Sequence, residues 1–354
     1  MSFSRKIIDW YQANKRDLPW RSTSDAYRIW LSEIILQQTR IDQGTSYYLR
    51  FVKRFPDIFE LAKAKEEDVL KLWQGLGYYS RARNLHATAI EIANNHKGKF
   101  PDNYSELLKL KGIGEYTAAA IASFAYNLPY AVSDGNVMRF MARYCAIATP
   151  INTSTGKKII QSKATEYMDP AQPALYNQAI MEFGALVCKP ASPLCSSCIF
   201  NTKCLALKKQ LVNDIPVKLG KIKTKDRFFN YLFIKINNDY VFIKKRTEND
   251  IWKGLYDFPM IETKEKISKE KLEKILRSEK YFGNKGIRIQ STSTEYIHIL
   301  SHQKLHAVFY NFEFSEEFHF DGFNNKYKKV DHEQLKKYPI PRLVEKFLLD
   351  INFF

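Results

Sequence analysis

Two carboxylates lie in sequence surroundings that suit different states of charge. Glu33 lies inside the apolar run 30–36 (WLSEIIL). It is either an exposed position on a helix or a buried acid with a raised pKa, and a general acid near neutral pH requires the second. Asp134 directly precedes an apolar helical pattern in 131–139 (AVSDGNVMR), where a carboxylate can cap the helix. Such a pair can divide proton donation and stabilisation of positive charge between its members.

A second group with chemical potential consists of cysteines. Four of the five lie close together, with the spacing Cys188-x6-Cys195-x2-Cys198-x5-Cys204. Four thiolates this close can surround one metal centre, and soft sulfur ligands select zinc or an iron–sulfur cluster. The spacing alone does not separate the two. Cys145, alone in a helical pattern, is expected to be a small buried hydrophobe.

The segment 107–120 (LLKLKGIGEYTAAA) predicts a site for an anion. A short helix ends at Gly112 and Gly114, which permit a tight turn and the close approach of another backbone. A second helix begins directly after them, and its unpaired N–H groups attract negative charge. No strand pattern precedes the glycines, which counts against a dinucleotide site.

These two motifs resemble those of the endonuclease III superfamily, whose cysteine loop follows a helix such as 183–187 (FGALV). The resemblance implies a structural [4Fe–4S] cluster and a helix-hairpin-helix that grips a DNA phosphate. It further implies that the cluster loop presents Lys203, Lys208 and Lys209 to DNA, although a solvated face is the alternative reading of these lysines. A monovalent cation at the hairpin would be held by the carbonyls of Leu108, Leu110 and Ile113.

The carboxylate segments 31–39 (LSEIILQQT) and 133–139 (SDGNVMR) match the catalytic segments of adenine DNA glycosylases of the MutY type. Together with the hairpin and the cysteines, this resemblance covers about the first 210 residues. It implies that Glu33 protonates adenine N7 and later helps to activate water. Asp134 would stabilise the oxocarbenium ion or bond transiently to C1′, and Tyr116 and Asn136 would position these groups.

The same resemblance assigns two sets of side chains to the DNA. The adenine pocket would be lined by Arg16, Leu18, Arg21, Gln178 and Met181. The duplex left by the flipped base would be filled or wedged by Gln37, Gln38, Thr39 and Tyr78. For Leu18 and Met181, plain core packing remains an equal alternative.

After Cys204 the sequence changes character. The stretch 252–259 (WKGLYDFP) resembles a signature of the Nudix-like domain with which adenine glycosylases inspect 8-oxoguanine. In 298–302 (HILSH), Leu300, Ser301 and His302 match the loop of that domain expected to read the oxidised base. Leu300 departs from the commoner phenylalanine, which weakens stacking there. A glutamate-rich pyrophosphatase motif is absent, so we expect no pyrophosphate hydrolysis.

Two other functions stay open. A bifunctional glycosylase that removes oxidised pyrimidines needs a lysine for its Schiff base, and that lysine would fall where this sequence has Tyr116. Such enzymes generally end shortly after the cluster, whereas this chain continues for about 150 residues. A non-catalytic iron–sulfur DNA-binding protein would need no pair of carboxylates beside an anionic duplex.

The elements that must position these residues fall into two classes. From Ser4 to about Leu211 the pattern is almost entirely helical. Helices are expected near 25–39, 66–73, 80–96, 105–110, 115–126, 136–146, 157–168 and 173–187. A β-hairpin is expected around 237–239, followed by a helix near 268–279 and strands near 294–300 and 305–314. The prediction is an all-α helix-hairpin-helix glycosylase domain (1–212), a basic linker (213–227) and an α+β Nudix-like domain (228–354).

The composition agrees with a nucleic-acid partner. The 354 residues include 55 Lys and Arg against 38 Asp and Glu, a formal net charge of +17 that favours a polyanion. Neither a signal-peptide pattern nor an apolar stretch of membrane-spanning length is present, so we expect a cytoplasmic protein with no membrane partner. We expect a monomer that acts on duplex DNA and excises adenine opposite 8-oxoguanine or guanine.

Overall fold

The computed structural model describes residues 2–220, 224–237, 239–278, 281–282, 288–314 and 326–353. Residues 221–223 of the expected linker, residue 238 of the expected turn and residue 279 of the expected helix lie outside them. The chain forms two compact units. The helical unit comprises Met1–Ala64 and Asn84–Gly220, and the sheet unit comprises Lys65–Arg83 and Lys221–Phe354.

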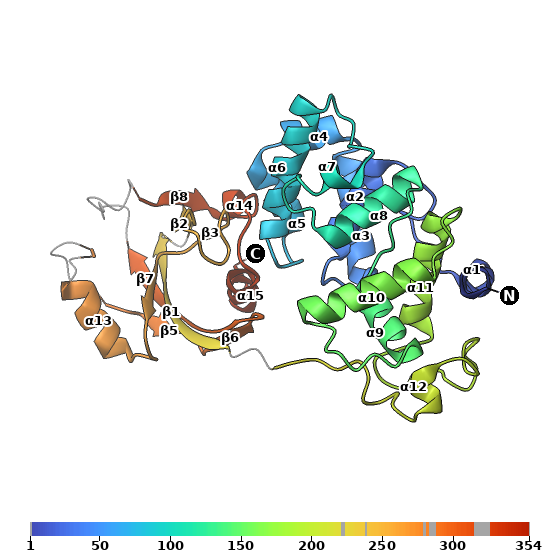
Figure 1. The fold of residues 1–354 in the computed structure, drawn as a ribbon. Coiled ribbons are helices and arrows are strands. Elements are labelled where there is room, and N and C mark those ends of the chain that lie inside the picture. The colour runs from blue at the N-terminus through green and yellow to red at the C-terminus, as the bar shows by residue number, and fades with distance from the viewer. Residues whose placement is uncertain are drawn as a thin grey trace. The chain divides into compact units, whose positions relative to one another are not determined.

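The helical unit contains most of the helices that the sequence pattern predicts for the first 211 residues, together with others (Figure 1), whereas the helix predicted at 66–73 lies in the sheet unit. In chain order they are α1 (Phe3–Asn14), α2 (Ala26–Leu36), α3 (Ile41–Arg54), α4 (Ile58–Lys63), α6 (Ser80–Asn95, whose first turn belongs to the sheet unit), α7 (Tyr104–Leu107), α8 (Glu115–Tyr126), α9 (Gly135–Tyr144), α10 (Ser154–Glu166), α11 (Pro173–Leu186) and α12 (Leu205–Lys208). Side chains accept backbone N–H bonds at several helix starts, with Asp25 before α2, Asp134 before α9 and Thr153 before α10. Each cap satisfies donors that have no partner within the helix.

A layer of aromatic rings forms the core beneath α1, α9 and α11. Phe140, Tyr176, Phe183 and Phe200 are buried, and the ring of Phe3 stacks on that of Phe200 with centroids 4.7 Å apart. Burying such large rings contributes to the stability of this unit. It also secures α9 and α11, which carry Asn136, Gln178 and Met181 of the candidate site.

The sheet unit is built on one mixed sheet, in which the strand order is β3-β2-β1-β7-β5. Its strands are β1 (Lys225–Ile236), β2 (Tyr240–Lys245), β3 (Tyr256–Asp257), β4 (Met260–Thr263), β5 (Ser291–Thr292), β6 (Tyr296–Ile299), β7 (Gln303–Phe314) and β8 (Lys328–Asp331). Its helices are α5 (Glu66–Trp73), α13 (Lys269–Ser278), α14 (His332–Leu335) and α15 (Arg342–Asp350). The predicted hairpin is confirmed, because β1 and β2 pair antiparallel through Ile236 and Tyr240.

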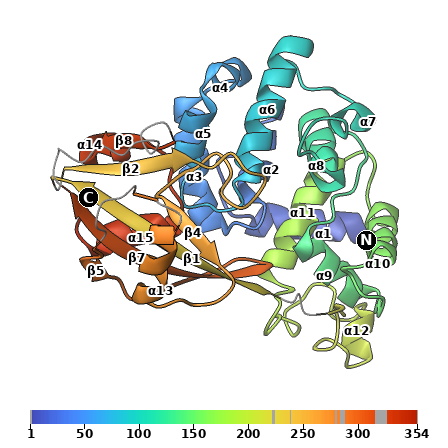
Figure 2. The ribbon, with the colours of Figure 1, turned by 90° about the vertical axis from the view of Figure 1, so that its left-hand side faces the viewer.

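The two faces of this sheet carry different helices. Leu232 and Ile234 on β1 face α13, where Leu272 is buried with them in one apolar cluster. Phe233 faces the opposite side and meets Phe347 of α15, with ring centroids 5.1 Å apart. Figures 1 and 2 show α13 and α15 on opposite sides of the strands. The alternating apolar residues of β1 therefore support a layer on each side.

Candidate functional site

A cavity of about 440 Å³ opens in the helical unit between α2, α8, α9 and α11. It brings together twelve residues that the sequence predicted for catalysis, the adenine pocket or the wedge: Arg16, Leu18, Arg21, Glu33, Gln37, Gln38, Thr39, Tyr116, Asp134, Asn136, Gln178 and Met181. These residues come from five separate segments of the chain, and they become neighbours only when the helices pack together. A volume of this size lies in the range of small-molecule sites and is ample for one purine base.

Glu33 is the buried carboxyl of the cavity. It is only 6% exposed, and the Tyr116 hydroxyl donates a hydrogen bond to its Oε2 at 2.6 Å. Burial raises the pKa of Glu33 to about 7; the Tyr116 bond and Arg21 act in the opposite direction, whereas Asp134 adds to the rise. Glu33 therefore holds a proton in a useful fraction of molecules at neutral pH, as a general acid must.

Asp134 is the second carboxylate of the cavity, and it also caps α9. Its Oδ1 accepts the backbone N–H groups of Asn136 at 2.9 Å and Val137 at 2.7 Å. Its Oδ2 accepts the Asn136 side-chain amide at 2.7 Å. Burial raises the pKa of Asp134, but all three donors favour the carboxylate form and oppose that effect. Asp134 accepts these three hydrogen bonds and Glu33 accepts one from Tyr116, so the ionised form is better stabilised at Asp134 than at Glu33.

The strand-like loop that leads to Asp134 is held by two amide side chains that sequence reasoning did not single out. Asn177 of α11 is fully buried; its Oδ1 accepts the Val132 N–H at 3.0 Å, and its Nδ2 donates to the Tyr130 carbonyl at 2.8 Å. Gln161 of α10 accepts the Ser133 hydroxyl at 2.6 Å. The position of Asp134 is therefore determined on both sides, by its own cap and by this loop.

The predicted base-binding arginines converge on a further residue that was not predicted, Glu182. Its carboxylate accepts bonds from the Arg16 guanidinium at 2.6 and 2.9 Å and from the Arg21 guanidinium at 2.7 and 3.0 Å. Burial alone would raise the pKa of Glu182, but these donors outweigh it and lower the pKa to about 2. A signal was present in the sequence, because Glu182 lies four residues after Gln178 on one face of an otherwise apolar helix.

The glycine turn lies outside this cavity, at the start of α8. Gly112 has a φ of +78°, and a Cβ there would lie 2.7 Å from the Cβ of Asn84. The hydroxyl of Thr88, a residue of α6, donates to the Lys111 carbonyl at 2.6 Å, so α6 holds the residue that precedes the turn. Gly114 is the N-cap residue of α8 and has open space around it. The predicted approach of another backbone is therefore sterically possible at this end of the helix.

The remaining predicted residues line a second cavity, of about 510 Å³, within the sheet unit. It is lined by Tyr78, Leu300, Ser301 and His302, and the hydroxyls of Tyr78 and Ser301 lie 2.6 Å apart. Trp252 also lines it. Aromatic faces beside hydroxyl and imidazole groups are suited to a flat, polar base.

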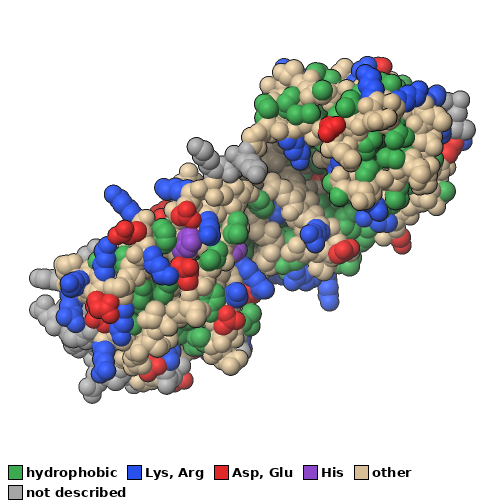
Figure 3. All heavy atoms as spheres, turned by 90° about the horizontal axis from the view of Figure 1, so that it is seen from below, with side chains coloured by type: hydrophobic (Ala, Val, Ile, Leu, Met, Phe, Trp, Pro, Cys, Tyr) green, Lys and Arg blue, Asp and Glu red, His purple; other side chains and the backbone are tan. Residues whose placement is uncertain are grey.

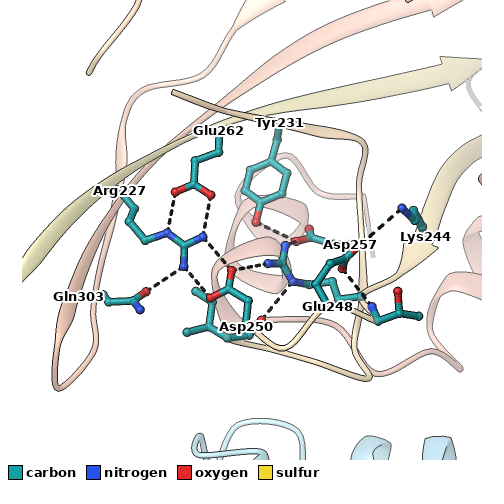
Figure 4. A network of polar contacts seen from close by, with 11 residues as sticks. Arg227, Tyr231, Lys244, Glu248, Asp250, Asp257, Glu262 and Gln303 are labelled. Carbon is teal, nitrogen blue, oxygen red and sulfur yellow. Dashed lines mark hydrogen bonds and ion pairs between the residues drawn. The ribbon is translucent and has the colours of Figure 1, made fainter. Parts of the chain in front are cut away.

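A network of ion pairs supports this second cavity (Figure 4). The Arg227 guanidinium donates to both oxygens of Asp250, at 2.8 and 2.7 Å, and to Oε1 of Gln303 at 3.1 Å. Arg246 bonds to the same Asp250 at 3.3 Å. Asp250 lies two residues before Trp252, and Gln303 follows His302 directly. The network therefore ties together the two loops that form the walls of the cavity.

All four clustered cysteines line one small apolar cavity beside α9: Cys188, Cys195, Cys198 and Cys204. No disulfide joins any two of them. The buried Arg143 donates to the carbonyls of Lys189 at 2.7 Å and Ile215 at 2.8 Å, and to Sγ of Cys188 at 3.6 Å. Within the described ranges, no three His, Cys, Asp or Glu side chains converge as ligands of a metal ion do.

The lysines of the cysteine loop are exposed, namely Lys203, Lys208 and Lys209. On the face drawn in Figure 3, Lys and Arg side chains are distributed among acidic and apolar ones rather than gathered into one patch. Searched over the described residues, no helix combines the length and the apolar character needed to cross a bilayer.

Two protein-family models match the chain, one in its helical part and one in its sheet-containing part, in broad agreement with the two units of the structure. Residues 31–166 match the model of the HhH-GPD superfamily base excision DNA repair proteins, and residues 230–350 match that of the NUDIX domain. The first match contains Glu33, Tyr116 and Asp134, and the second contains Ser301 and His302.

Several curated relatives align over much of the chain. An adenine DNA glycosylase of Buchnera aphidicola subsp. Schizaphis graminum is 37% identical over 310 residues, which are 86% of this chain and 86% of that protein. The human adenine DNA glycosylase is 39% identical over 217 residues, covering 59% of this chain and 40% of that protein.

Solved structures resemble the helical part. A thermostable thymine-DNA glycosylase superposes with a TM-score of 0.55 at 27% identity, over 58% of this chain and 95% of that chain. A non-covalent endonuclease III–DNA complex superposes with a TM-score of 0.51 at 18% identity, over 59% of this chain and 94% of that chain, which shows a shared fold.

Proposed function

The chain belongs to the adenine DNA glycosylase family of base excision DNA repair, and from this premise we propose that its helical unit takes a flipped adenine into the cavity of α2, α9 and α11 and hydrolyses the N-glycosidic bond. The observation that carries the proposal is the pair of carboxylates in that cavity. Glu33 is buried with one donor, and Asp134 is held by three. N-glycoside cleavage requires this division between an acid and an anion.

Glu33 delivers its proton to adenine N7, which makes the base a neutral leaving group. Its carboxylate then helps to activate the attacking water. Tyr116 orients Glu33 through the 2.6 Å hydrogen bond. As positive charge develops at C1′, Asp134 stabilises the oxocarbenium ion, either electrostatically or through a transient bond. Asn136 holds the Oδ2 of Asp134 in place.

Two sets of side chains position the base. Arg16, Arg21 and Gln178 supply the polar wall of the adenine pocket, and Leu18 and Met181 supply its apolar wall. Gln37, Gln38 and Thr39 lie in the turn after α2, at the edge of the same cavity. They fill the gap that the flipped adenine leaves, together with Tyr78.

The sheet unit reads the base opposite adenine, and the cavity around Ser301 and His302 suits 8-oxoguanine. An oxidised guanine differs from guanine by an added carbonyl and a proton on N7, which hydroxyl and imidazole groups can distinguish. The turn at Gly112 and Gly114 binds a DNA phosphate through backbone N–H groups. The carbonyls of Leu108, Leu110 and Ile113, which lie in or beside this turn, would supply oxygen ligands for a monovalent cation.

The four cysteines fit an iron–sulfur cluster better than one zinc ion. They line a single apolar cavity of soft thiolate ligands, and their spacing resembles that of the four-iron clusters of the endonuclease III superfamily. Cys188, Cys195, Cys198 and Cys204 would hold the cluster, whose contribution is to close the loop that follows α11. That loop presents Lys203, Lys208 and Lys209 for contact with DNA phosphates.

A lyase mechanism has little support in this cavity. Tyr116 occupies the position of the expected lysine, and in the described part of the chain no lysine lines the cavity. The test is single-turnover cleavage of duplexes with adenine opposite 8-oxoguanine, adenine opposite guanine, and thymine glycol opposite adenine. We expect adenine release fastest opposite 8-oxoguanine, with strand breaks only after alkali. Removal of thymine glycol with breaks that need no alkali would overturn the proposal.

A further inference from the structure

Gln178, in the wall of the adenine pocket, has a carboxamide whose hydrogen-bonding sense is ambiguous by nature. A carboxamide offers an oxygen acceptor and an NH₂ donor of nearly equal size, so rotation by half a turn exchanges them. Adenine presents an amino donor at position 6 beside a ring-nitrogen acceptor. A 6-oxopurine such as hypoxanthine presents a carbonyl acceptor at position 6 instead. A freely rotating amide can therefore pair with either base.

In this structure the amide of Gln178 is not free to rotate. The Tyr11 hydroxyl of α1 donates to its Oε1 at 2.5 Å. Tyr11 is 2% exposed, and the Arg21 guanidinium lies over its ring at 5.5 Å from the centroid. Arg21 is held in turn by Glu182 at 2.7 Å. The ring that holds the amide is thus itself held by packing and by an ion pair.

The direction of this hydrogen bond follows from the surroundings of the phenol. Burial raises the pKa of Tyr11, so the hydroxyl keeps its proton at neutral pH. Within the part of the chain that the structure describes, Gln178 is the hydrogen-bond partner of that hydroxyl. If the amide turned its NH₂ group towards Tyr11, the phenol proton would lose its acceptor inside the core, which is unfavourable. The oxygen of Gln178 therefore faces Tyr11, and one of its lone pairs remains for the base.

We propose that Tyr11 is a specificity-determining positioning residue, whose hydroxyl locks the Gln178 amide in the sense that pairs with adenine and not with a 6-oxopurine. This inference rests on the proposed function, since it takes the cavity as the adenine pocket. In the locked sense, the amide oxygen accepts from the amino group at position 6 and the NH₂ group donates to ring nitrogen N1, so N7 stays free to take the proton of Glu33. A base with a carbonyl at position 6 would instead place that oxygen against the amide oxygen, and two hydrogen-bond acceptors repel each other.

The experiment compares single-turnover release of adenine and of hypoxanthine, each placed opposite 8-oxoguanine. The measured quantity is the ratio of the two rates. Tyr11→Phe should lower this ratio by roughly fivefold, the contribution of one net hydrogen bond to the orientation of the amide. The matched control is Tyr176→Phe, which removes a buried hydroxyl that donates to the Ala164 carbonyl at 2.9 Å and should leave the ratio unchanged.

A second comparison, made in a variant that lacks the Gln178 amide, distinguishes this positioning role of Tyr11 from a merely structural one. In Gln178→Leu, which lacks the amide, the ratio should already be low, and adding Tyr11→Phe should not lower it further. Gln178→Leu also tests the idea if Tyr11→Phe does not fold, and an unchanged ratio in that variant would overturn it. An unchanged ratio in folded Tyr11→Phe, or the same effect with and without the amide, would overturn it as well. If the wild-type protein released no adenine, the proposed function would fail, and this inference with it.

Discussion

The ion pairs of Glu182 lead to a quantitative prediction for Glu182→Gln, a change that keeps the size of the side chain and removes its charge. The Glu182 side chain is 1% exposed, so solvent screens its interactions little. Lowering its pKa from 4.5 to about 2 corresponds to about 3 kcal/mol of stabilisation of the ionised form at neutral pH. We expect the variant to lose about 2–3 kcal/mol of unfolding free energy at pH 7.

The sign of the pH dependence follows from the same pKa. A carboxyl with a lowered folded-state pKa stabilises the fold above its unfolded pKa of 4.5, and this contribution is lost as the pH falls towards about 2. The difference between wild type and Glu182→Gln should therefore be about 1 kcal/mol smaller at pH 4 than at pH 7. The assay is urea unfolding of both proteins at the two pH values.

Adenine release should fall together with stability, because Arg16 and Arg21 lose the carboxylate that holds them in the base pocket. The matched control is Glu166→Gln, which removes an exposed, solvent-screened ion pair with Lys163 and should lower the unfolding free energy far less. If the two variants lost the same small amount of unfolding free energy, the reasoning about the buried network would be refuted.

Three further predictions concern the other parts of the site. Glu33→Gln should abolish adenine release in single-turnover assays and spare duplex binding measured by fluorescence anisotropy; normal release would remove Glu33 from the mechanism. Ser301→Ala combined with His302→Ala should reduce the preference for 8-oxoguanine over guanine opposite adenine, and an unchanged rate ratio would place lesion reading elsewhere. Gly184→Ala should slow adenine release by roughly tenfold, because its Cβ would lie 2.7 Å from the Asn136 carbonyl oxygen and push Asn136 out of place; wild-type rates would show that α9 and α11 can separate without harm.

Much of the helical unit was predictable because its helices carry local signals. The helix over 115–126 was predicted with the bounds of α8, since two glycines mark its start and Asn127, at φ 52°, ends it. α3 was missed because its buried face is Gly44, Tyr48 and Phe51, which is not an aliphatic repeat. α15 was also not predicted, although Leu343, Val344, Phe347 and Leu348 form a buried face at helical spacing.

The long-range arrangement could not be obtained from local patterns. β1 and β7 pair in parallel over their whole length, with Lys225 opposite Gln303, although 66 residues separate the two strands. Nothing in either strand specifies that register, because it depends on which faces the helices cover. Within the site, Glu33, Asp134 and Gln178 were predictable from motifs. Tyr11 was not, because its hydrogen bond to Gln178 joins two helices far apart in the chain, and Glu182 left only the weak signal of its place on one face of an apolar helix.

The most direct test of the central claim, that a buried and partly protonated Glu33 releases the adenine, is the pH dependence of single-turnover adenine release opposite 8-oxoguanine. Because the pKa of Glu33 is raised to about 7, the acid form is abundant below that pH and is lost above it. The account predicts a rate that falls about tenfold per pH unit once the pH exceeds about 7. A rate that stayed constant from pH 6 to pH 9, with the protein folded and bound to DNA throughout, would contradict it.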